Sequence, residues 1–359
     1  MNGLVWPTII EGTGILKDAI NRYSDAVWCV SPSLMESFKG SDISSDQIVT
    51  AKEADLVRLN ELHELISKSA PSTIVALGGG KAIDLAKLAA RYETVDDPSL
   101  WGNKAGLLQY QRTRSMQLIA IPSTAGSGSE TSETAVITVN GHKTPIHSDK
   151  LRPDLVLLDP NLIYNAPPRV LWNGLWDTFV HALESSLSPI SNADTLAHSL
   201  EVFRNSKEMI DHSMRKSSIK EQFPASPAQW NSLRAGKAQS KASVGLAHAL
   251  AHQSEHSNQW HGEACARVLV NVLAKNAEKA EAKITKLAET AGFSSIEQLM
   301  DWTGSAVGHS VGAFIPNHFS EDEKGQVLMR IMKDPCFRTN PVFWTKSELS
   351  IWLEEWFYE

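Results

Sequence analysis

Cysteine is scarce in this 359-residue sequence, and long apolar segments are missing. The three cysteines, Cys29, Cys265 and Cys336, lie far apart and form no CxxC pair. This spacing excludes a disulfide framework, argues against a thiolate metal site and is typical of a reducing compartment. No segment approaches the roughly 18 apolar residues of a membrane helix, and the first residues, MNGLVWPTIIEGTG, lack the pattern of a secretory signal. We therefore expect a cytoplasmic protein without a membrane span.

Concentrated charge of one sign is missing too. The formal net charge is -7, and it is spread along the chain without a block of like charges. Such blocks mark nucleic-acid arms and polybasic membrane anchors, so neither kind of partner is expected. No fixed-period repeat and no extended low-complexity segment occurs, which excludes a solenoid. A chain of this length exceeds one compact unit, and we expect two domains.

Short apolar runs alternate with helical patterns in the first part of the chain, as in an α/β layer. The runs that we expect to be buried strands are residues 25–30, 72–80, 116–123, 134–139 and 154–160. Residues 51–68 predict a crossover helix with a polar and a leucine-rich face. Beyond Ala166 long helical stretches dominate, ending in a final helix with Ser347 as the expected N-cap. These patterns predict an α/β domain over 1–166 and an all-α domain over 167–359.

Two glycine- or hydroxyl-rich loops follow predicted strands. Gly78, Gly79 and Gly80 precede the helix that carries Lys81 and Asp84, and such a turn allows backbone N–H groups to approach a phosphate. The second loop, PSTAGSGSETSE, offers the hydroxyls of Ser123, Thr124 and Ser127. Alone, the first could be a tight turn and the second a flexible surface loop. Together they favour binding of a dinucleotide.

Histidines gather in the segment GLAHALAHQSEHSNQWHGEA. Its His248 and His252 are four residues apart, and Asp177 and His181 have the same spacing in an earlier helix, so each pair shares a helix face. With His261 added, Asp177, His181 and His248 would supply four oxygen and nitrogen ligands, a set suited to Fe(II) or Zn(II). A single histidine is more often a surface or hydrogen-bonded residue, and we assign that role to His256. Packed imidazoles without an ion would repel on protonation, which favours the metal interpretation for the cluster.

These motifs resemble those of the iron-containing (group III) alcohol dehydrogenase family, over nearly the whole chain. GGGKAIDLAK resembles the pyrophosphate turn of that family, IPSTAGSGSETSETAVIT its nucleotide loop, and the segments around Asp177 and His248 its two metal-bearing helical segments. The resemblance implies a Rossmann-like N-terminal domain, a helical C-terminal domain, and binding of NAD(P) and a divalent metal. It places the metal ligands at Asp177, His181, His248 and His261, a non-ligating active-site histidine at His252, and a lysine near the cofactor at Lys143.

The same resemblance bears on the metal and on the cofactor. The related glycerol dehydrogenases and dehydroquinate synthases have three-ligand zinc sites without a histidine at the position of His181, so its presence favours iron over zinc. Members that prefer NAD often carry an aspartate after the second strand, where this chain has Ser31. Without that charge a 2′-phosphate is not repelled, and we expect NADPH to be accepted as well as NADH. The stretch from His248 to His261 is one residue shorter than in many members.

A basic stripe precedes the histidines. Arg234, Lys237 and Lys241 recur at helical spacing and are expected to share a face with His248 and His252. One interpretation is a solvated basic face. The other is that Lys237, Gln239 and Lys241 line the substrate pocket and neutralise an anionic group. The segment loosely resembles phosphonoacetaldehyde reductases of the same family, which supports the second interpretation.

The expected activity is hydride transfer between NAD(P)H and a small aldehyde, of the phosphonoacetaldehyde or semialdehyde type, with the metal acting as a Lewis acid and His252 relaying a proton. Polyol oxidation of the glycerol dehydrogenase type and a cyclase reaction of the dehydroquinate synthase type are the alternatives. A non-catalytic metal- or nucleotide-binding protein is a further one. By analogy with the family, a homodimer is expected.

Overall fold

The computed structural model describes residues 5–93, 114–253, 260–312 and 319–358. The chain divides into two compact units, one made of Met1–Ala166 with Pro224–Ser240, the other of Pro167–Phe223 with Lys241–Glu359. The segment 224–240 therefore packs with the first unit, although its helical pattern places it with the second. Within the described residues, no helix has both the length and the apolar character needed to cross a membrane.

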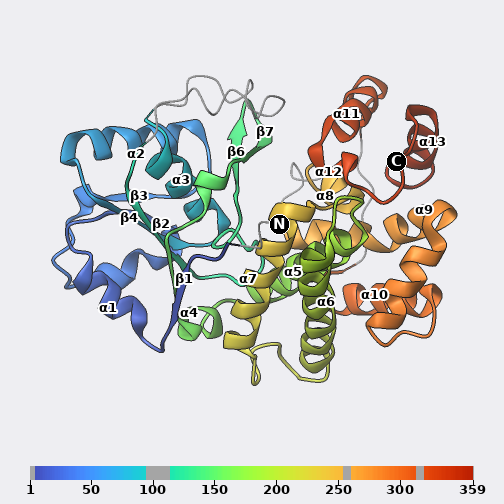
Figure 1. The fold of residues 1–359 in the computed structure, drawn as a ribbon, viewed down its shortest axis with the longest axis horizontal. Helices are drawn as coiled ribbons and strands as arrows, with labels where there is room; N and C mark the ends of the chain where they lie inside the picture. Colours follow the sequence, from blue (N-terminus) through green and yellow to red (C-terminus); the bar gives the residue numbers. More distant parts are fainter. Residues whose placement is uncertain (1–4, 94–113, 254–259, 313–318, 359) are drawn as a thin grey trace. The chain divides into compact units, whose positions relative to one another are not determined.

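A parallel six-stranded sheet forms the centre of the first unit (Figure 1). Its strands, in spatial order, are β1 (Thr8–Glu11), β8 (Leu155–Leu158), β5 (Gln117–Pro122), β4 (Thr73–Gly78), β2 (Val27–Val30) and β3 (Ile48–Thr50). All neighbouring pairs are parallel. The central strands are buried on both faces, as expected of apolar runs in a parallel sheet. The predicted α/β class is confirmed.

The run 134–139 does not join this sheet. It forms β6 (Thr134–Val139), which pairs antiparallel with β7 (His142–His147) in a separate hairpin. Asn140 and Gly141, with φ of 51° and 78°, form the tight turn between them, the Asn-Gly sequence that such hairpins prefer. Buried residues alternate along β6, because only one of its faces packs on the unit.

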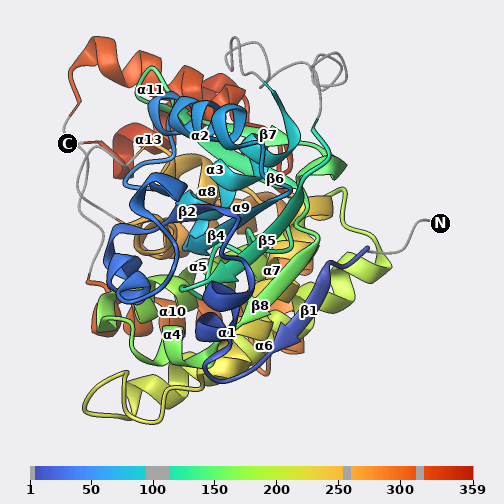
Figure 2. The same cartoon turned by 90° about the vertical axis from the view of Figure 1, so that its left-hand side faces the viewer.

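Helices cover both faces of the sheet (Figure 2). The helices of the first unit are α1 (Ile15–Arg22), α2 (Leu56–Ser69), α3 (Gly80–Arg91), α4 (Pro160–Tyr164) and most of α7 (Ala225–Ala242). The helix α2 starts later than predicted, because Asp55 caps it by accepting a hydrogen bond from the Arg58 backbone N–H at 2.9 Å. One core lies between the sheet and α2, α3 and the hairpin, and the other lies under α1.

The described part of the second unit is helical. Its helices are α5 (Pro168–Leu187), α6 (Ala193–Met214), α8 (Leu246–Ala251), α9 (His261–Thr290), α10 (Ile296–Ser310), α11 (Glu321–Lys333), α12 (Pro335–Arg338) and α13 (Lys346–Trp356). The helix α5 packs against α6 and α9, and from Gly174 onward it is buried on all sides. The cap of α13 is Thr345 rather than the predicted Ser347, because Thr345 and Glu348 form a capping box.

The predicted basic stripe is broken between α7 and α8. The helix α7 ends at Ala242, Ser243 has a left-handed φ of 59°, and α8 begins only at Leu246. Because the helical register is lost at Ser243, Lys237 and Lys241 do not share a helix face with His248 and His252. The expectation that the basic residues share a face with these histidines was wrong.

Candidate metal centre and nucleotide-binding loops

The helix α5 supplies the first two predicted ligands. Asp177 and His181 lie one turn apart, with 3.8 Å between Asp177 Oδ1 and His181 Nδ1. Both side chains are buried. The spacing of four residues places them on one helix face, as the sequence predicts.

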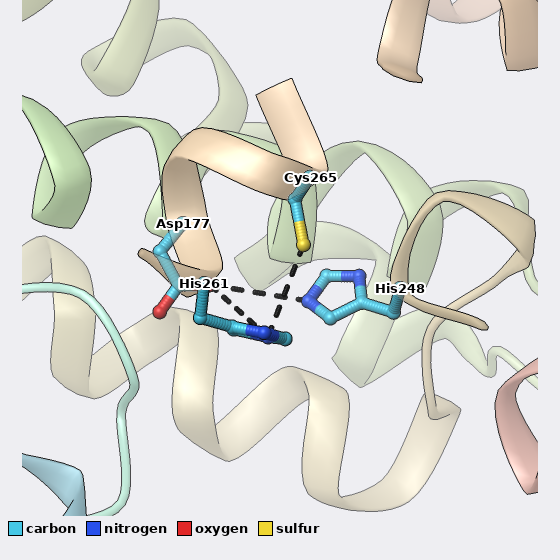
Figure 3. Close-up of side chains that lie close together, drawn as sticks. All are labelled: Asp177, His248, His261 and Cys265. Atoms are coloured by element: carbon cyan, nitrogen blue, oxygen red, sulfur yellow. Dashed lines mark hydrogen bonds and ion pairs between the residues drawn. The ribbon is translucent and has the colours of Figure 1, made fainter. Parts of the chain in front are cut away.

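The helices α8 and α9 bring two further imidazoles to Asp177. His248 Nε2 and His261 Nε2 each lie 3.9 Å from Asp177 Oδ1. Figure 3 shows the side chains of Asp177, His248 and His261 converging from α5, α8 and α9. The ring of His181 stacks on that of His248, with centroids 4.6 Å apart. The four predicted ligands thus lie side by side, but His181 is not in the group of donor atoms that lie within 4.8 Å of one another, which contains Asp177, His248 and His261.

A glycine permits this convergence. A Cβ at Gly262 would overlap the Asn173 carbonyl oxygen and lie 2.9 Å from the Asp177 Cβ, so only glycine allows α9 to start this close to α5. Next to it, Arg169 donates to both carboxylate oxygens of Glu263, at 2.6 and 2.8 Å. These contacts fix the first turn of α9, and with it His261, against α5.

Glu184, one turn after His181 on α5, holds the ring of His248. Its Oε2 lies 2.7 Å from His248 Nδ1, and its two oxygens also accept the N–H groups of Gly245 at 2.8 Å and Ala247 at 2.7 Å. Burial, reinforced by the neighbouring imidazoles, lowers the pKa of His248 well below its usual value, which keeps the ring neutral. The neutral ring donates from Nδ1 to Glu184 and carries its lone pair on Nε2. Among the described residues, that buried Nε2 has no hydrogen-bond partner.

Cys265 lies beside this group, although no pattern in the sequence indicated a thiol there. It follows His261 by one turn of α9, with 3.8 Å between Cys265 Sγ and His261 Nε2 (Figure 3). Donor atoms of Asp177, His248, His261 and Cys265 lie within 4.8 Å of one another. The carboxylate and the neutral imidazoles suit Fe(II) or Zn(II), and the adjacent sulfur is a ligand that zinc accepts more readily than iron(II) does.

His252 lies at the C-terminal end of α8 beside the predicted ligands. Its ring stacks on that of His261, with centroids 5.5 Å apart and an angle of 16° between the planes. Its Nδ1 lies 2.7 Å from Asp334 Oδ2. His256, to which the sequence gives no function, lies outside the described residues.

The first unit forms a close-packed turn at the end of β4. A Cβ at Gly78 would overlap Ser31 Oγ, one at Gly79 would lie 3.1 Å from Thr124 Oγ1, and one at Gly80 would lie 3.2 Å from Ser127 Oγ. Hydroxyls from two loops thus surround the turn. The helix α3 begins at Gly80, so its N-terminal N–H groups and the positive end of its dipole lie at the same turn. Such a cradle fits a pyrophosphate. Ser123 joins it through its backbone, whose N–H donates to the Gly78 carbonyl at 2.9 Å.

Asp84 contributes to this turn indirectly. Its carboxylate accepts hydrogen bonds from the Ser129 hydroxyl and from the Val136 N–H, the latter at 2.9 Å. On the next turn of α3, the fully buried Lys87 donates to Ser132 Oγ at 3.0 Å and to the Thr134 carbonyl at 2.7 Å. Both side chains therefore tie the loop 122–133 to α3.

The other predicted cofactor and substrate residues lie in varied surroundings. Lys81 is exposed and pairs with Glu53 at 2.7 Å, and Lys143 lies on β7 in register with Thr138. Lys237 is fully buried in the first unit, with its Nζ 3.7 Å from Glu133 Oε1. Gln239 is half-buried, and Lys241 is exposed in the last turn of α7. Glu133 also pairs with Arg152 at 3.0 Å, and a role of the buried Lys237 in binding an anion stays a prediction.

Comparison with known families covers most of the chain. Residues 30–160 match the family model of iron-containing alcohol dehydrogenase, and residues 173–313 match the C-terminal model of the Fe-containing alcohol dehydrogenase family. The chain belongs to the iron-containing alcohol dehydrogenase family.

Individual relatives are distant. The 1-propanol dehydrogenase PduQ of Salmonella typhimurium is 30% identical over 236 residues, which span 63% of this chain and 58% of that relative. Among solved structures, the iron-containing alcohol dehydrogenase of Thermococcus thioreducens superposes with a TM-score of 0.80 at 22% identity, covering 99% of both chains. The sulfoacetaldehyde reductase of Bifidobacterium kashiwanohense, solved with NAD+, also gives a TM-score of 0.80 at 22% identity and covers 98% of this chain and 99% of its own. These likenesses confirm the fold.

Three residues around this site were not expected from the sequence patterns. Glu184 continues the face of Asp177 and His181 by one turn, so helical spacing could have found it. Cys265 follows His261 by one turn in the same way. Asp334 lies 82 residues from its partner His252, and no local pattern connects them.

Proposed function

We propose that this chain is a metal-dependent, NAD(P)H-linked alcohol dehydrogenase or aldehyde reductase that acts on a small aldehyde. The observation that carries the proposal is the gathering of one carboxylate and three imidazoles from α5, α8 and α9, with Asp177, His181 and His248 buried and His261 half-buried, in a chain of this family. A buried group of this kind fits a cation, because neutral imidazole lone pairs and one carboxylate charge together suit a divalent ion.

The proposed ligands are Asp177, His181, His248 and His261. Stacking of His181 on His248 and its 3.8 Å contact with Asp177 support its inclusion. Four oxygen and nitrogen ligands suit iron(II) or zinc(II), and the family resemblance at His181 favours iron(II), whereas recruitment of Cys265 would favour zinc. The proposal therefore names Fe(II), with Zn(II) as the alternative.

The remaining residues have distinct proposed roles. The N–H groups of Gly78, Gly79 and Gly80 hold the pyrophosphate, and Thr124 and Ser127 orient it by their hydroxyls. When bound, the divalent metal supplies a Lewis acid and the nicotinamide supplies the hydride. His252 exchanges a proton with the substrate hydroxyl.

The cofactor is proposed to be NADPH or NADH. Ser31 follows β2 and packs on Gly78, so the position after β2 carries a hydroxyl instead of a charge that repels a 2′-phosphate. Turnover with NADH that exceeds turnover with NADPH by a hundredfold would contradict acceptance of NADPH. The proposal also includes a homodimer, by analogy with the family, and sedimentation of the metal-loaded chain would test it.

The substrate is proposed to be a small aldehyde, with an anionic one as the narrower possibility. Lys237 is fully buried, whereas Gln239 is half-buried and Lys241 is exposed, so Lys241 is the lysine that a substrate anion reaches more readily. Lys241→Ala should weaken the apparent affinity for phosphonoacetaldehyde or sulfoacetaldehyde and leave that for propanal unchanged. Equal KM values in the variant and the native chain for all three would remove the anionic substrate from the proposal.

The deciding experiment follows nicotinamide absorbance. The chain is loaded with Fe(II) or Zn(II) without oxygen and mixed with NADPH or NADH and a panel of aldehydes, including propanal, succinic semialdehyde and phosphonoacetaldehyde. Net oxidation of the cofactor that matches the alcohol formed is the expected result. A cyclase would consume no net cofactor, and a binding protein would show no turnover.

Two matched variants test the ligands. Asp177→Ala should lose the metal and the activity together, because three imidazoles without the carboxylate bind a cation far more weakly. Cys265→Ala should retain metal content, because its thiol is not one of the four proposed ligands. The opposite pattern in metal analysis would exclude this ligand set.

A further inference from the structure

Besides the contact of Glu184 with His248, the helical unit contains another carboxylate–imidazole contact of hydrogen-bond length. His248 and His252 lie four residues apart at α8, and the Nδ1 of each faces a carboxylate at 2.7 Å, from Glu184 and Asp334 respectively. Glu184 faces a proposed ligand. Asp334 faces His252, the histidine proposed to exchange a proton with the substrate, and Asp334 itself has no part in the proposed function.

The carboxylate of Asp334 is held by the backbone around it. Its Oδ1 accepts the N–H of Cys336 at 2.8 Å, which makes Asp334 the N-cap of α12. Its own N–H donates to the carbonyls of Arg330 at 2.9 Å and Ile331 at 3.1 Å, at the end of α11. Oδ2 is then the oxygen that meets His252. An acceptor fixed in this way restricts the orientation of the imidazole more strictly than a mobile side chain would.

A metal site at the same place is the competing interpretation. Donor atoms of His252, Asp334 and Cys336 lie within 4.8 Å of one another. However, the 2.7 Å between Nδ1 and Oδ2 is the length of a charge-assisted hydrogen bond, and the other oxygen of Asp334 is used by the α12 cap. The contacts therefore favour a hydrogen-bonded pair.

We propose that Asp334 is a positioning residue that keeps the His252 proton on Nδ1, so that the lone pair on Nε2 exchanges the substrate proton. This inference rests on the proposed function. In alcohol oxidation the substrate O–H bond breaks, its electron pair stays on oxygen, and the proton forms a new N–H bond at Nε2. The hydride lost from carbon reduces the oxidised nicotinamide. Aldehyde reduction returns the proton from Nε2 to oxygen.

Two variants of Asp334 separate its effect on the His252 tautomer from its effect as the N-cap of α12. In Asp334→Asn the single amide oxygen can cap α12, which turns the NH₂ toward Nδ1 and moves the ring proton to Nε2. In Asp334→Ser the hydroxyl still caps α12, since serine is a good N-cap, but is too short to reach the ring. A matched control, Ser295→Ala, removes the cap of α10, where Ser295 Oγ accepts the Gln298 N–H at 3.2 Å.

The first readout does not depend on turnover. Long-range ¹H–¹⁵N spectra of the ¹⁵N-histidine-labelled, Zn²⁺-loaded full chain report the tautomer of each ring, and His252→Gln identifies the His252 signals by their loss. The native chain should show protonated Nδ1 at His252, and Asp334→Asn should show protonated Nε2. A protonated Nε2 in the native chain would overturn the inference.

The second readout is kinetic. Asp334→Asn and Asp334→Ser should lower kcat by about 100-fold with little change in KM, the size expected from loss of general acid–base catalysis. The double variant His252→Gln/Asp334→Asn should be no slower than His252→Gln alone, because Asp334 acts through His252. Ser295→Ala should retain native kcat despite a lower Tm. Native kcat in Asp334→Asn, or additive losses in the double variant, would refute the positioning role.

The two proposals fail differently. A native chain that turns over no aldehyde or alcohol contradicts the proposed function, and the His252 tautomer is still measured. A native chain that turns over substrate normally but shows no tautomer change in Asp334→Asn contradicts only the role of Asp334.

Discussion

Two imidazoles at and beside the candidate metal centre, those of His248 and His252, face carboxylates that set which nitrogen carries the proton. Glu184 accepts from His248 Nδ1 and from two backbone N–H groups of the α8 entrance, so both of its oxygens are engaged. Burial raises the pKa of Glu184 to about 7, against the opposing effect of these hydrogen bonds. A carboxylate in this position orients a metal-binding histidine and increases its basicity.

Glu184→Gln should weaken metal binding by about 10- to 100-fold. The amide carries no charge, and with its oxygen at the position of Oε2 its NH₂ would meet the Ala247 N–H, so the variant polarises the His248 ring less and loses an acceptor at the start of α8. Competition between the chain and a chelator for Zn²⁺ measures the change.

The control for this variant is Ser186→Ala on the same helix, where the buried Ser186 hydroxyl donates only to the Ala182 carbonyl at 2.7 Å. It should bind Zn²⁺ like the native chain. Equal affinity in Glu184→Gln and Ser186→Ala would show that the carboxylate does not tune the ligand.

Single-residue predictions succeeded where the relevant spacing was local. Asp177 and His181 are one turn apart on α5, and the structure places them together as the helical period requires. Asp334 shows the limit, because its contact with His252 exists only after α8, α11 and α12 pack together. Lys237 shows another limit, since the sequence does not reveal that Glu133 lies opposite it in the folded unit.

Whole elements depend on where the helical register is interrupted. The spacing from Arg234 to His252 is regular in the sequence, but the left-handed Ser243 separates α7 from α8. Residues 225–240 of α7 instead pack with the first unit, against the loop 122–133. There Thr131 Oγ1 donates to the Leu233 carbonyl at 2.7 Å, and the backbone at Gly128 passes close to Gly236. This helix therefore supports the proposed nucleotide loop.

Gly236→Ala should weaken nucleotide binding by about tenfold, which corresponds to ~1.4 kcal/mol. An added Cβ would overlap the Gly128 carbonyl oxygen. Because this neighbour is backbone, no change of side-chain rotamer relieves the overlap, and the backbone itself must shift. The loop that carries Thr124 and Ser127 would then shift relative to the glycine turn. Fluorescence titration with NADPH and with NADH measures the loss.

The matched control is Gly304→Ala in α10. A Cβ at Gly304 would lie 3.9 Å from Val270 Cγ2, which is ordinary contact, and alanine is the better helix former. It should leave nucleotide affinity unchanged and raise Tm slightly. If Gly236→Ala also bound nucleotide like the native chain, the close packing of α7 would not be needed to hold the loop 122–133 in place for nucleotide binding.

At the scale of the whole molecule, the sequence patterns predicted an α/β part and a helical part. They did not predict the path of the chain between these parts. The pattern could not show that 224–240 returns to the first unit, nor that 134–139 leaves the sheet for a hairpin, because both depend on tertiary contacts. The same contacts bury a network of charges in the first unit, including Asp84, Lys87 and Glu130. A buried network makes the stability of the chain depend on pH.

Glu130 gives that dependence a definite sign. Burial raises its pKa to about 7 in the folded chain, above its ordinary value near 4.5, although Ser232 donates to it at 3.2 Å. The folded state therefore binds the proton more tightly than the unfolded state does. The stability linked to this proton is fully present below pH ~4.5 and is lost as the pH rises through ~7.

Glu130→Gln should remove this loss of stability at high pH. The neutral amide does not ionise, so no charge has to be buried, and its oxygen can still accept the hydrogen bond from Ser232. The variant should have a Tm close to that of the native chain at pH 5 and a higher Tm at pH 8, by an amount equivalent to roughly 2 kcal/mol. Thermal unfolding between pH 5 and 8.5 measures the difference, with the exposed Glu355→Gln as the control that should follow the native chain throughout. A Tm difference between Glu130→Gln and the native chain that stays constant over this range would mean that Glu130 does not titrate with folding.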